Sequence, residues 1–193
     1  MKRLLALLAT VASVVSAQSI PPDAPRKAPE LAFTVPGQGQ KLLSQYRGKV
    51  VSVEFIFTTC PHCQAATKIM EKFQKEFAPR GFQALDVAVN ENADLLVENF
   101  AKDFQVNFPV GWVLRDQFIS FMGWSNPYFV VPQEVLIDRK GMIRYQTPAR
   151  EDANWDALMK EDALRQHIEE LLAGGPSSAG TKPAATHVAL AKK

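Results

Sequence analysis

Two cysteines, Cys60 and Cys63, are the residues whose type and spacing could do chemistry in this chain, and the sequence contains no other cysteine. A thiolate attacks a disulfide through a mixed-disulfide intermediate, and a second thiol nearby can then resolve that intermediate. The Cys-Pro-His-Cys spacing suits this reaction because it keeps the two sulfurs about one helical turn apart. We therefore expect thiol–disulfide exchange with Cys60 as the nucleophile, Cys63 as the resolving residue, and no cofactor beyond the reversible Cys60–Cys63 disulfide.

The cysteines follow an apolar run and open a segment with helical spacing. Pro61 suits the first position of a helix, where its missing N–H costs no hydrogen bond, and this places Cys60 at the helix cap. The positive end of the helix dipole favours a thiolate there, and a protonated His62 adds positive charge beside it. Cys63 lies one turn into the helix, so we expect it to be more shielded from solvent.

Three other interpretations of the cysteine pair compete with redox chemistry. A structural disulfide would close a very small ring and contribute only about 2 kcal/mol before strain is subtracted. A zinc site needs two more ligands, and the sequence has neither a second cysteine pair nor a close histidine pair, so we expect no stable metal. A chance Cys-x-x-Cys at the start of a helix is the third. The strand–turn–helix context favours redox chemistry over all three.

An acidic residue, Glu54, stands inside the apolar run 50–57, six residues before Cys60. In a regular strand it shares a face with Ile56. A buried carboxylate is costly unless it is paired or protonated. One interpretation is a carboxyl with a raised pKa that carries protons to or from Cys63 during exchange. The alternative is a carboxylate near the strand end that reaches solvent or a lysine.

The elements that must position these residues alternate between strands and helices. Apolar, β-branched and aromatic runs predict strands, and apolar residues at helical spacing predict helices. The expected strands cover residues 31–35, 50–57, 82–89, 108–114, 133–137 and 142–146, and the expected helices cover 61–77, 92–104, 116–122 and 152–172. This order predicts an α/β fold with a central mixed sheet, helices on both faces and an extra N-terminal β element.

Residues 1–17 have the three parts of an export signal: a positive start, an apolar stretch over 4–15, and small side chains at the end. As a helix, the apolar stretch would rise only about 18 Å, short of a bilayer core of about 30 Å. We expect cleavage after Ala17 and a periplasmic or other extracytoplasmic location, with an uncleaved, tethering anchor as the alternative. The expected remainder is a Pro-rich lead-in (18–28), a folded domain (29–172) and a flexible Gly/Pro/Ala/Lys tail (173–193).

The charge distribution argues against a nucleic-acid-binding protein. The formal net charge is +2, but several of the 22 basic residues lie near the two ends, whereas all 20 acidic residues lie between them. The body of the chain is therefore slightly acidic and has no basic face for nucleic acid. The longest apolar run is short and N-terminal, which excludes a multi-span membrane protein.

A resemblance to the thioredoxin superfamily is carried by VVSVEFIFTTCPHC and VPQEVLIDRKGMIRY. The chain is most similar to the exported TlpA/ResA-type branch of thiol–disulfide oxidoreductases in that superfamily. The preceding segment, APELAFTVPGQGQKLLSQYRGKVV, resembles the extra N-terminal hairpin of this branch. The resemblance spans residues 28–146 and implies a thioredoxin-like fold.

The resemblance also assigns roles outside the cysteine pair. In this family the proline before the late strand is cis and lies against the two cysteines, so Pro132 and the Val131 backbone would form the edge where the substrate docks. Glu54 falls where thioredoxins carry a buried acid, which supports the proton-carrying interpretation. Thr59 replaces the family's usual tryptophan and would alter the docking surface around the nucleophile.

Two features of the sequence point to opposite redox directions. The Pro-His dipeptide between the cysteines is typical of DsbA-like oxidants, whereas the rest of the chain resembles TlpA/ResA-type reductants. We favour the reductant and keep the oxidant as the alternative. In either direction the expected partners are protein thiols or disulfides as substrates and a membrane redox protein that recycles the cysteine pair.

Two alternative functions belong to other classes. A peroxiredoxin-like thiol peroxidase would use Cys60 as the peroxidatic residue and Cys63 as the resolving one. The Thr-x-x-Cys signature of that branch would, however, require a threonine in place of Phe57. The other alternative is a non-catalytic thioredoxin-fold module that binds proteins or handles metal.

Overall fold

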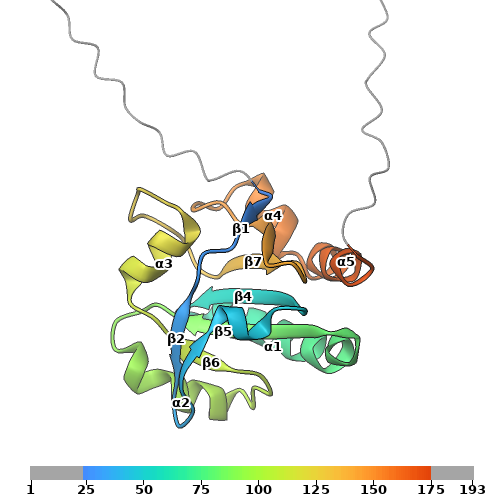
Figure 1. Cartoon of the computed structure of the whole chain (residues 1–193). Helices are drawn as coiled ribbons and strands as arrows, with labels where there is room; N and C mark the ends of the chain where they lie inside the picture. The colour runs from blue at the N-terminus through green and yellow to red at the C-terminus, as the bar shows by residue number, and fades with distance from the viewer. Residues whose placement is uncertain (1–23, 175–193) are drawn as a thin grey trace, which may run out of the picture.

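The computed structural model describes residues 24–174, and Figure 1 shows a central sheet with helices around it. The expected export signal and all but the first two residues of the expected tail lie outside the described residues. No helix within 24–174 combines the length and the apolar character that are needed to cross a membrane.

The described residues form one mixed sheet, as predicted. The strands are β1 (Arg26–Lys27), β2 (Ala32–Val35), β3 (Gly39–Leu42), β4 (Val50–Ile56), β5 (Phe82–Ala88), β6 (Val110–Trp112), β7 (Gln133–Ile137) and β8 (Met142–Gln146). The helices are α1 (Pro61–Phe77), α2 (Ala93–Asp103), α3 (Arg115–Met122), α4 (Ala153–Met159) and α5 (Glu161–Leu172), with 3₁₀ turns η1 (Leu43–Tyr46) and η2 (Ala78–Arg80). The strand order is β1-β8-β7-β4-β5-β6-β2-β3, in which β4, β5 and β6 are parallel and the other pairs antiparallel.

Both faces of the sheet are buried. Alternate residues of a strand point to opposite faces, so Val51, Val53 and Phe55 of β4 enter one core cluster while Val50 and Ile56 enter clusters on the other face. Side chains of α3 complete the first cluster, and those of α1, α2 and α5 complete the others. Figure 1 shows α1 and α5 as neighbours, with α3 on the far side of the sheet. This confirms the prediction that helices flank both faces.

The N-terminal β element is more extensive than expected. β2 and β3 form a hairpin, and Thr34 of β2 pairs with Trp112 of β6, which attaches the hairpin to the edge of the sheet. This close approach needs Gly111, because a Cβ atom there would lie 2.7 Å from the Phe33 ring. β1 pairs with β8 at the opposite edge. The sheet thus extends into residues 18–28, which were expected to be only a lead-in.

The C-terminal helix predicted over residues 152–172 is in fact two helices, so that prediction was wrong. Lys160 has an extended backbone (φ −66°, ψ 134°), which ends α4 and begins α5. Asp152 caps α4 by accepting hydrogen bonds from the N–H groups of Asn154 and Trp155 at 2.8 and 3.0 Å. The break allows α5 to pack beside α1 while α4 reaches the loop that precedes β7.

Candidate active site

The Cys-Pro-His-Cys segment lies where β4 ends and α1 begins. Cys60 is the N-cap residue of α1, with an extended backbone (φ −85°, ψ 122°), and Pro61 takes the first helical position. The Cys60 side chain makes no capping hydrogen bond, and the residue is partly exposed, so it can meet a partner. Both cysteines are free thiols, and Cys63 is buried.

Cys63 lies in an apolar cluster with Ile56 and Ala88, and its exposed fraction is 0%. The Phe57 N–H donates to Cys63 Sγ at 3.4 Å, which favours the thiolate. Burial outweighs this bond and raises the pKa of the Cys63 thiol well above its ordinary value. A base must therefore take the Cys63 proton before this sulfur can attack a disulfide.

The turn between β4 and α1 is held by two side chains that the sequence did not single out. Asn90 Oδ1 accepts a hydrogen bond from the Thr58 N–H at 3.0 Å, and Gln64 Nε2 donates to the Thr58 carbonyl at 3.2 Å. Asn90 follows β5, so only the folded sheet brings it to this turn. Thr59 and His62 remain exposed beside the nucleophile.

The loop before β7 meets the cysteines from the other side. The Val131–Pro132 peptide bond is cis. Val131 and Cys60 both pack against the apolar cluster that contains Cys63, so this loop and the start of α1 come together at the cysteine pair. Trp155 Nε1 donates to the Pro132 carbonyl at 3.3 Å. Trp155 therefore helps to hold the loop.

Glu54 is fully buried, and neither of its carboxyl oxygens has a hydrogen-bond partner among the described residues. The alternative of a carboxylate that reaches solvent or a lysine is therefore wrong. Its direct neighbours across the sheet are Asp86 on β5 and Glu134 on β7. Burial, followed by the charges of Asp86 and Glu134, raises the pKa of Glu54 well above its ordinary value.

Asp86, Glu54 and Glu134 form a row of carboxyl groups across β5, β4 and β7, called the acid row below, and each has an exposed fraction of 0%. The Thr67 hydroxyl donates to Asp86 Oδ2 and the Ser52 hydroxyl donates to Glu134 Oε1, both at 2.7 Å. Burial is the main cause that raises the pKa of Asp86 to about 7 and that of Glu134 to about 8. Asp86 and Glu134 were missed at the level of sequence, although each is an acid in a mainly apolar strand, as Glu54 is.

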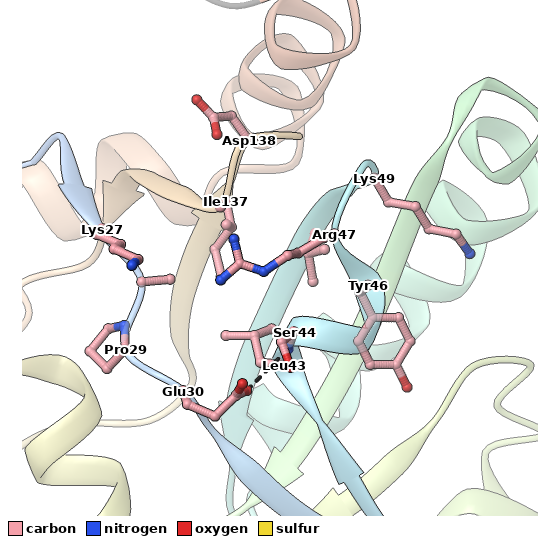
Figure 2. A pocket seen from close by; sticks show the side chains of 13 residues that line it. Lys27, Pro29, Glu30, Leu43, Ser44, Tyr46, Arg47, Lys49, Ile137 and Asp138 are labelled. Atoms are coloured by element: carbon pink, nitrogen blue, oxygen red, sulfur yellow. Dashed lines mark hydrogen bonds between the residues drawn. The ribbon is translucent and has the colours of Figure 1, made fainter.

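Of two hollows in the structure, one borders the cysteine turn and the other does not. A groove of about 590 Å³ borders the cysteine turn and is lined by Phe57, Thr59 and Trp112, among others. A hollow of about 180 Å³ lies instead at the amino end of β4, and Figure 2 shows the Arg47 side chain reaching into it. No predicted site residue lines this second hollow. Within residues 24–174, no group of three or more His, Cys, Asp or Glu side chains is placed to hold a metal ion.

The fold has solved counterparts. A crystal structure of a thiol:disulfide interchange protein of the thioredoxin family from Chlorobium tepidum matches with a TM-score of 0.63 and 22% identity, covering 78% of this chain and 99% of that one. This likeness confirms the thioredoxin-like fold predicted from the sequence. The chain thus has a thioredoxin-like fold with a cysteine pair at the strand–helix junction.

Within that class, the chain belongs to the AhpC/TSA family, whose model matches residues 25–146. The thiol-disulfide oxidoreductase ResA of Geobacillus kaustophilus is 30% identical over 146 residues, which cover 75% of each chain. The ResA of Geobacillus thermodenitrificans is 30% identical over 129 residues, or 67% of each chain. Protein DipZ of Mycobacterium bovis is 26% identical over 166 residues, which are 82% of this chain but 23% of DipZ. The resemblance to ResA-type proteins is thus confirmed.

The acid row predicts an unusual dependence of stability on pH. Because folding raises the pKa of all three carboxyl groups, the folded state binds more protons than the unfolded state, and stability falls as pH rises through the folded pKa values. Above about pH 5, where exposed carboxyls are already ionised, the free energy of unfolding should decrease by a few kcal/mol toward pH 9, since one pKa unit is worth about 1.4 kcal/mol.

Urea denaturation at a series of pH values measures this dependence. Glu134→Gln removes one acid but keeps an oxygen that can accept from Ser52, so it should flatten the decrease. A free energy of unfolding that rises with pH over this range, or a slope that the variant leaves unchanged, would contradict the account.

Proposed function

We propose that this chain exchanges disulfides with cysteines of other proteins through Cys60 and Cys63. The observation that carries the proposal is the contrast between the two sulfurs, because Cys60 is half-exposed at a helix N-terminus and Cys63 is buried one turn further on. A mixed disulfide with a protein substrate can form only at the exposed sulfur, and the buried sulfur is then shielded from outside thiols. The two ResA relatives at 30% identity support this proposal.

In the reductive direction, the reaction has two steps. The Cys60 thiolate attacks one sulfur of the substrate disulfide, forms a mixed disulfide and releases the other substrate sulfur as a thiolate. Cys63 then loses its proton and attacks the Cys60 sulfur, which breaks the bond to the substrate and forms the Cys60–Cys63 disulfide. Two electrons pass to the substrate, and the oxidative direction is the reverse sequence.

Glu54 is proposed as the group that exchanges a proton with Cys63. The carboxyl and the thiol share the α1 side of the sheet, and the charge of Glu54 is among the causes that raise the pKa of Cys63. A base is needed because the burial that shields Cys63 also disfavours its thiolate. Proton transfer is most effective when the pKa of the base lies near the operating pH. Burial raises the pKa of Glu54 in that direction.

The docking surface is proposed to combine three features. Val131 and Pro132 supply a backbone edge beside the cysteines, as in the family that the sequence resembles. Thr59 is exposed next to Cys60 and also lines the groove of about 590 Å³. An extended substrate segment that carries its disulfide to Cys60 would therefore lie between this edge and the groove.

We further propose that the protein is exported and works as a reductant. Residues 1–17 support export, and the resemblance of the sequence to TlpA/ResA-type reductants supports the reductive direction. An exported reductant cannot draw on cytosolic thiol systems, so a membrane redox protein would have to deliver electrons to the Cys60–Cys63 disulfide. No nucleic acid and no metal enter this scheme.

Trapping the mixed disulfide tests the assignment of the two cysteines. Cys63→Ser should accumulate a covalent adduct with a disulfide-bearing protein such as insulin, and mass spectrometry should map it to Cys60. Cys60→Ser should give little or no adduct, because the remaining sulfur is buried. Adducts formed equally by both variants would overturn the assignment. If neither variant forms them and the wild type consumes peroxide, the thiol peroxidase alternative would be favoured.

Equilibration with glutathione tests whether the protein works as a reductant or as an oxidant. For a reductant, the Cys60–Cys63 couple should have a potential near that of thioredoxin, about −270 mV. A potential near that of DsbA, about −120 mV, would instead indicate an oxidant, which is the direction that the Pro-His dipeptide favours. Quantifying the reduced and oxidised protein over a range of glutathione ratios separates these outcomes, and the higher value would contradict the reductive direction while leaving exchange itself intact.

A further inference from the structure

The loop that carries the proposed docking edge has no regular secondary structure to hold it. Residues 123–132 join α3 to β7 without forming a helix or a strand. Near β7 the main chain of the loop is fixed by hydrogen bonds, since the Val130 N–H donates to the Ala149 carbonyl at 3.0 Å and Gln133 Nε2 donates to the Val130 carbonyl at 2.9 Å. The part of the loop before Val130 depends on other contacts.

Arg115 of α3 holds this earlier part of the loop. Its Nη2 atom donates to the Pro127 carbonyl at 2.8 Å, and its guanidinium carbon lies 4.7 Å from the centre of the Phe129 ring. A planar guanidinium can stack on an aromatic ring while it donates hydrogen bonds, a combination that the ammonium group of lysine does not reproduce. One side chain of α3 thus fixes two residues of the loop.

The Phe129 ring extends this contact to the cysteine turn. It lies edge-on to the Phe57 ring, with 6.1 Å between the ring centres. Phe57 directly follows β4, and its N–H donates to Cys63 Sγ. Arg115 and Phe57 also line the groove of about 590 Å³ that borders the cysteine turn. The loop, the groove and the cysteine turn therefore meet around Arg115 and Phe129.

Helix stability does not account for an arginine at this position. Arg115 is the first residue of α3, where the positive end of the helix dipole disfavours a cation. Within residues 24–174, no acidic side chain forms an ion pair with it. The exposed side chain makes its two specific contacts with the loop instead. Holding the loop is therefore the contribution of Arg115 that the structure supports.

We propose that Arg115 is a positioning residue for protein substrates, because it holds loop 123–132 so that the Val131–Pro132 edge stays in place beside Cys60. The inference rests on the proposed function, in which this edge docks the substrate segment. Arg115 acts through the loop and takes no part in the bonds that form and break at the sulfurs. A small disulfide reagent that reaches Cys60 without docking on the edge should not need Arg115.

Two disulfide substrates separate docking from the chemistry at the cysteines. Insulin presents its disulfides within a protein chain, and its kcat and KM are measured with dithiothreitol as the electron donor. An aryl disulfide reagent that releases a coloured thiolate presents no chain, and its rate constant is measured with the pre-reduced protein and no other thiol. Both measurements are made on the full chain as wild type, Arg115→Ala, Arg115→Lys and Arg80→Ala.

Arg80→Ala is the matched control. Arg80 is also exposed, and its guanidinium carbon lies 5.4 Å from the centre of the Phe77 ring. It follows the carboxyl end of α1, whereas the cysteines lie at the amino end of that helix. The control therefore removes the same charge and the same kind of contact at a place remote from the docking edge.

The expected effect is on KM for the protein substrate. Arg115→Ala should raise the KM for insulin about tenfold and leave kcat nearly unchanged, because it loses one hydrogen bond and one cation–π contact that hold the docking edge. Arg115→Lys should give an intermediate KM, since lysine keeps the charge but not the stacked geometry. The rate constant with the aryl reagent should stay at the wild-type value in both variants, and Arg80→Ala should match the wild type throughout.

Hydrogen exchange measures the effect on the loop itself. In Arg115→Ala, the amides of residues 128–130 should exchange faster than in the wild type, whereas in Arg80→Ala they should not. Urea denaturation should give Arg115→Ala a midpoint no lower than that of Arg80→Ala, so that a raised KM does not reflect unfolding. If Arg115→Ala does not fold, Arg115→Lys takes its place, with an increase in KM and faster loop exchange as the same two requirements.

Four results would count against the account in different ways. An unchanged KM for insulin in Arg115→Ala would refute the inference and leave the proposed function intact. Equal slowing with insulin and with the aryl reagent would refute it too, because the effect would then lie at the cysteines. A raised KM without faster exchange in the loop would refute positioning and indicate that Arg115 contacts the substrate directly. A wild type that reduces neither substrate would contradict the proposed function itself.

Discussion

The first turn of α1 packs directly against the carboxyl end of β4, and this contact places one sulfur of the cysteine pair in the core while the other stays at the surface. Pro61 begins the helix immediately after Cys60, so Cys63 falls one turn inside and meets Ile56 and Ala88. The two thiols therefore differ in access and in the free energy of ionisation, although they are chemically identical. In the proposed reaction, the order of attack and resolution follows from that difference.

Burial also explains why a carboxyl group belongs beside the pair. A site dry enough to shield Cys63 from outside thiols disfavours its thiolate, and the same dryness raises the pKa of a nearby carboxyl toward that of the thiol. In the proposed reaction, Glu54 can serve as a base because burial raises its pKa. The acid row extends this arrangement over three strands, at a cost in stability that grows as the pH rises.

The local parts of the site could be predicted from the sequence because they follow from neighbouring residues. The buried strand, the proline at the helix start and the capping position of Cys60 all lie within one short segment, and strand parity placed Glu54 on the same face as Ile56. The partners of Glu54 could not be predicted in this way. Asp86 and Glu134 join the row only through the register of β5 and β7 against β4, which depends on the packing of the whole sheet.

The side chains that hold the cysteine turn and the Pro132 loop could not be predicted from the sequence either. Asn90 and Trp155 reach the cysteine turn and the Pro132 loop from segments distant in the sequence. The break at Lys160, which turns α4 toward that loop, was missed because residues 152–172 contain no proline or glycine that would mark the end of a helix. Helical periodicity reports which face is apolar, and it does not report where one helix stops and another begins.

The most direct test of the difference in accessibility between the two sulfurs is the rate at which each is alkylated in the folded, reduced wild-type protein. Iodoacetamide would be added at neutral pH, and site-resolved mass spectrometry would follow Cys60 and Cys63 separately over time. The account predicts that Cys60 is modified promptly while Cys63 reacts only when the protein is unfolded in urea. Alkylation of the two cysteines at similar rates in the folded protein would contradict it.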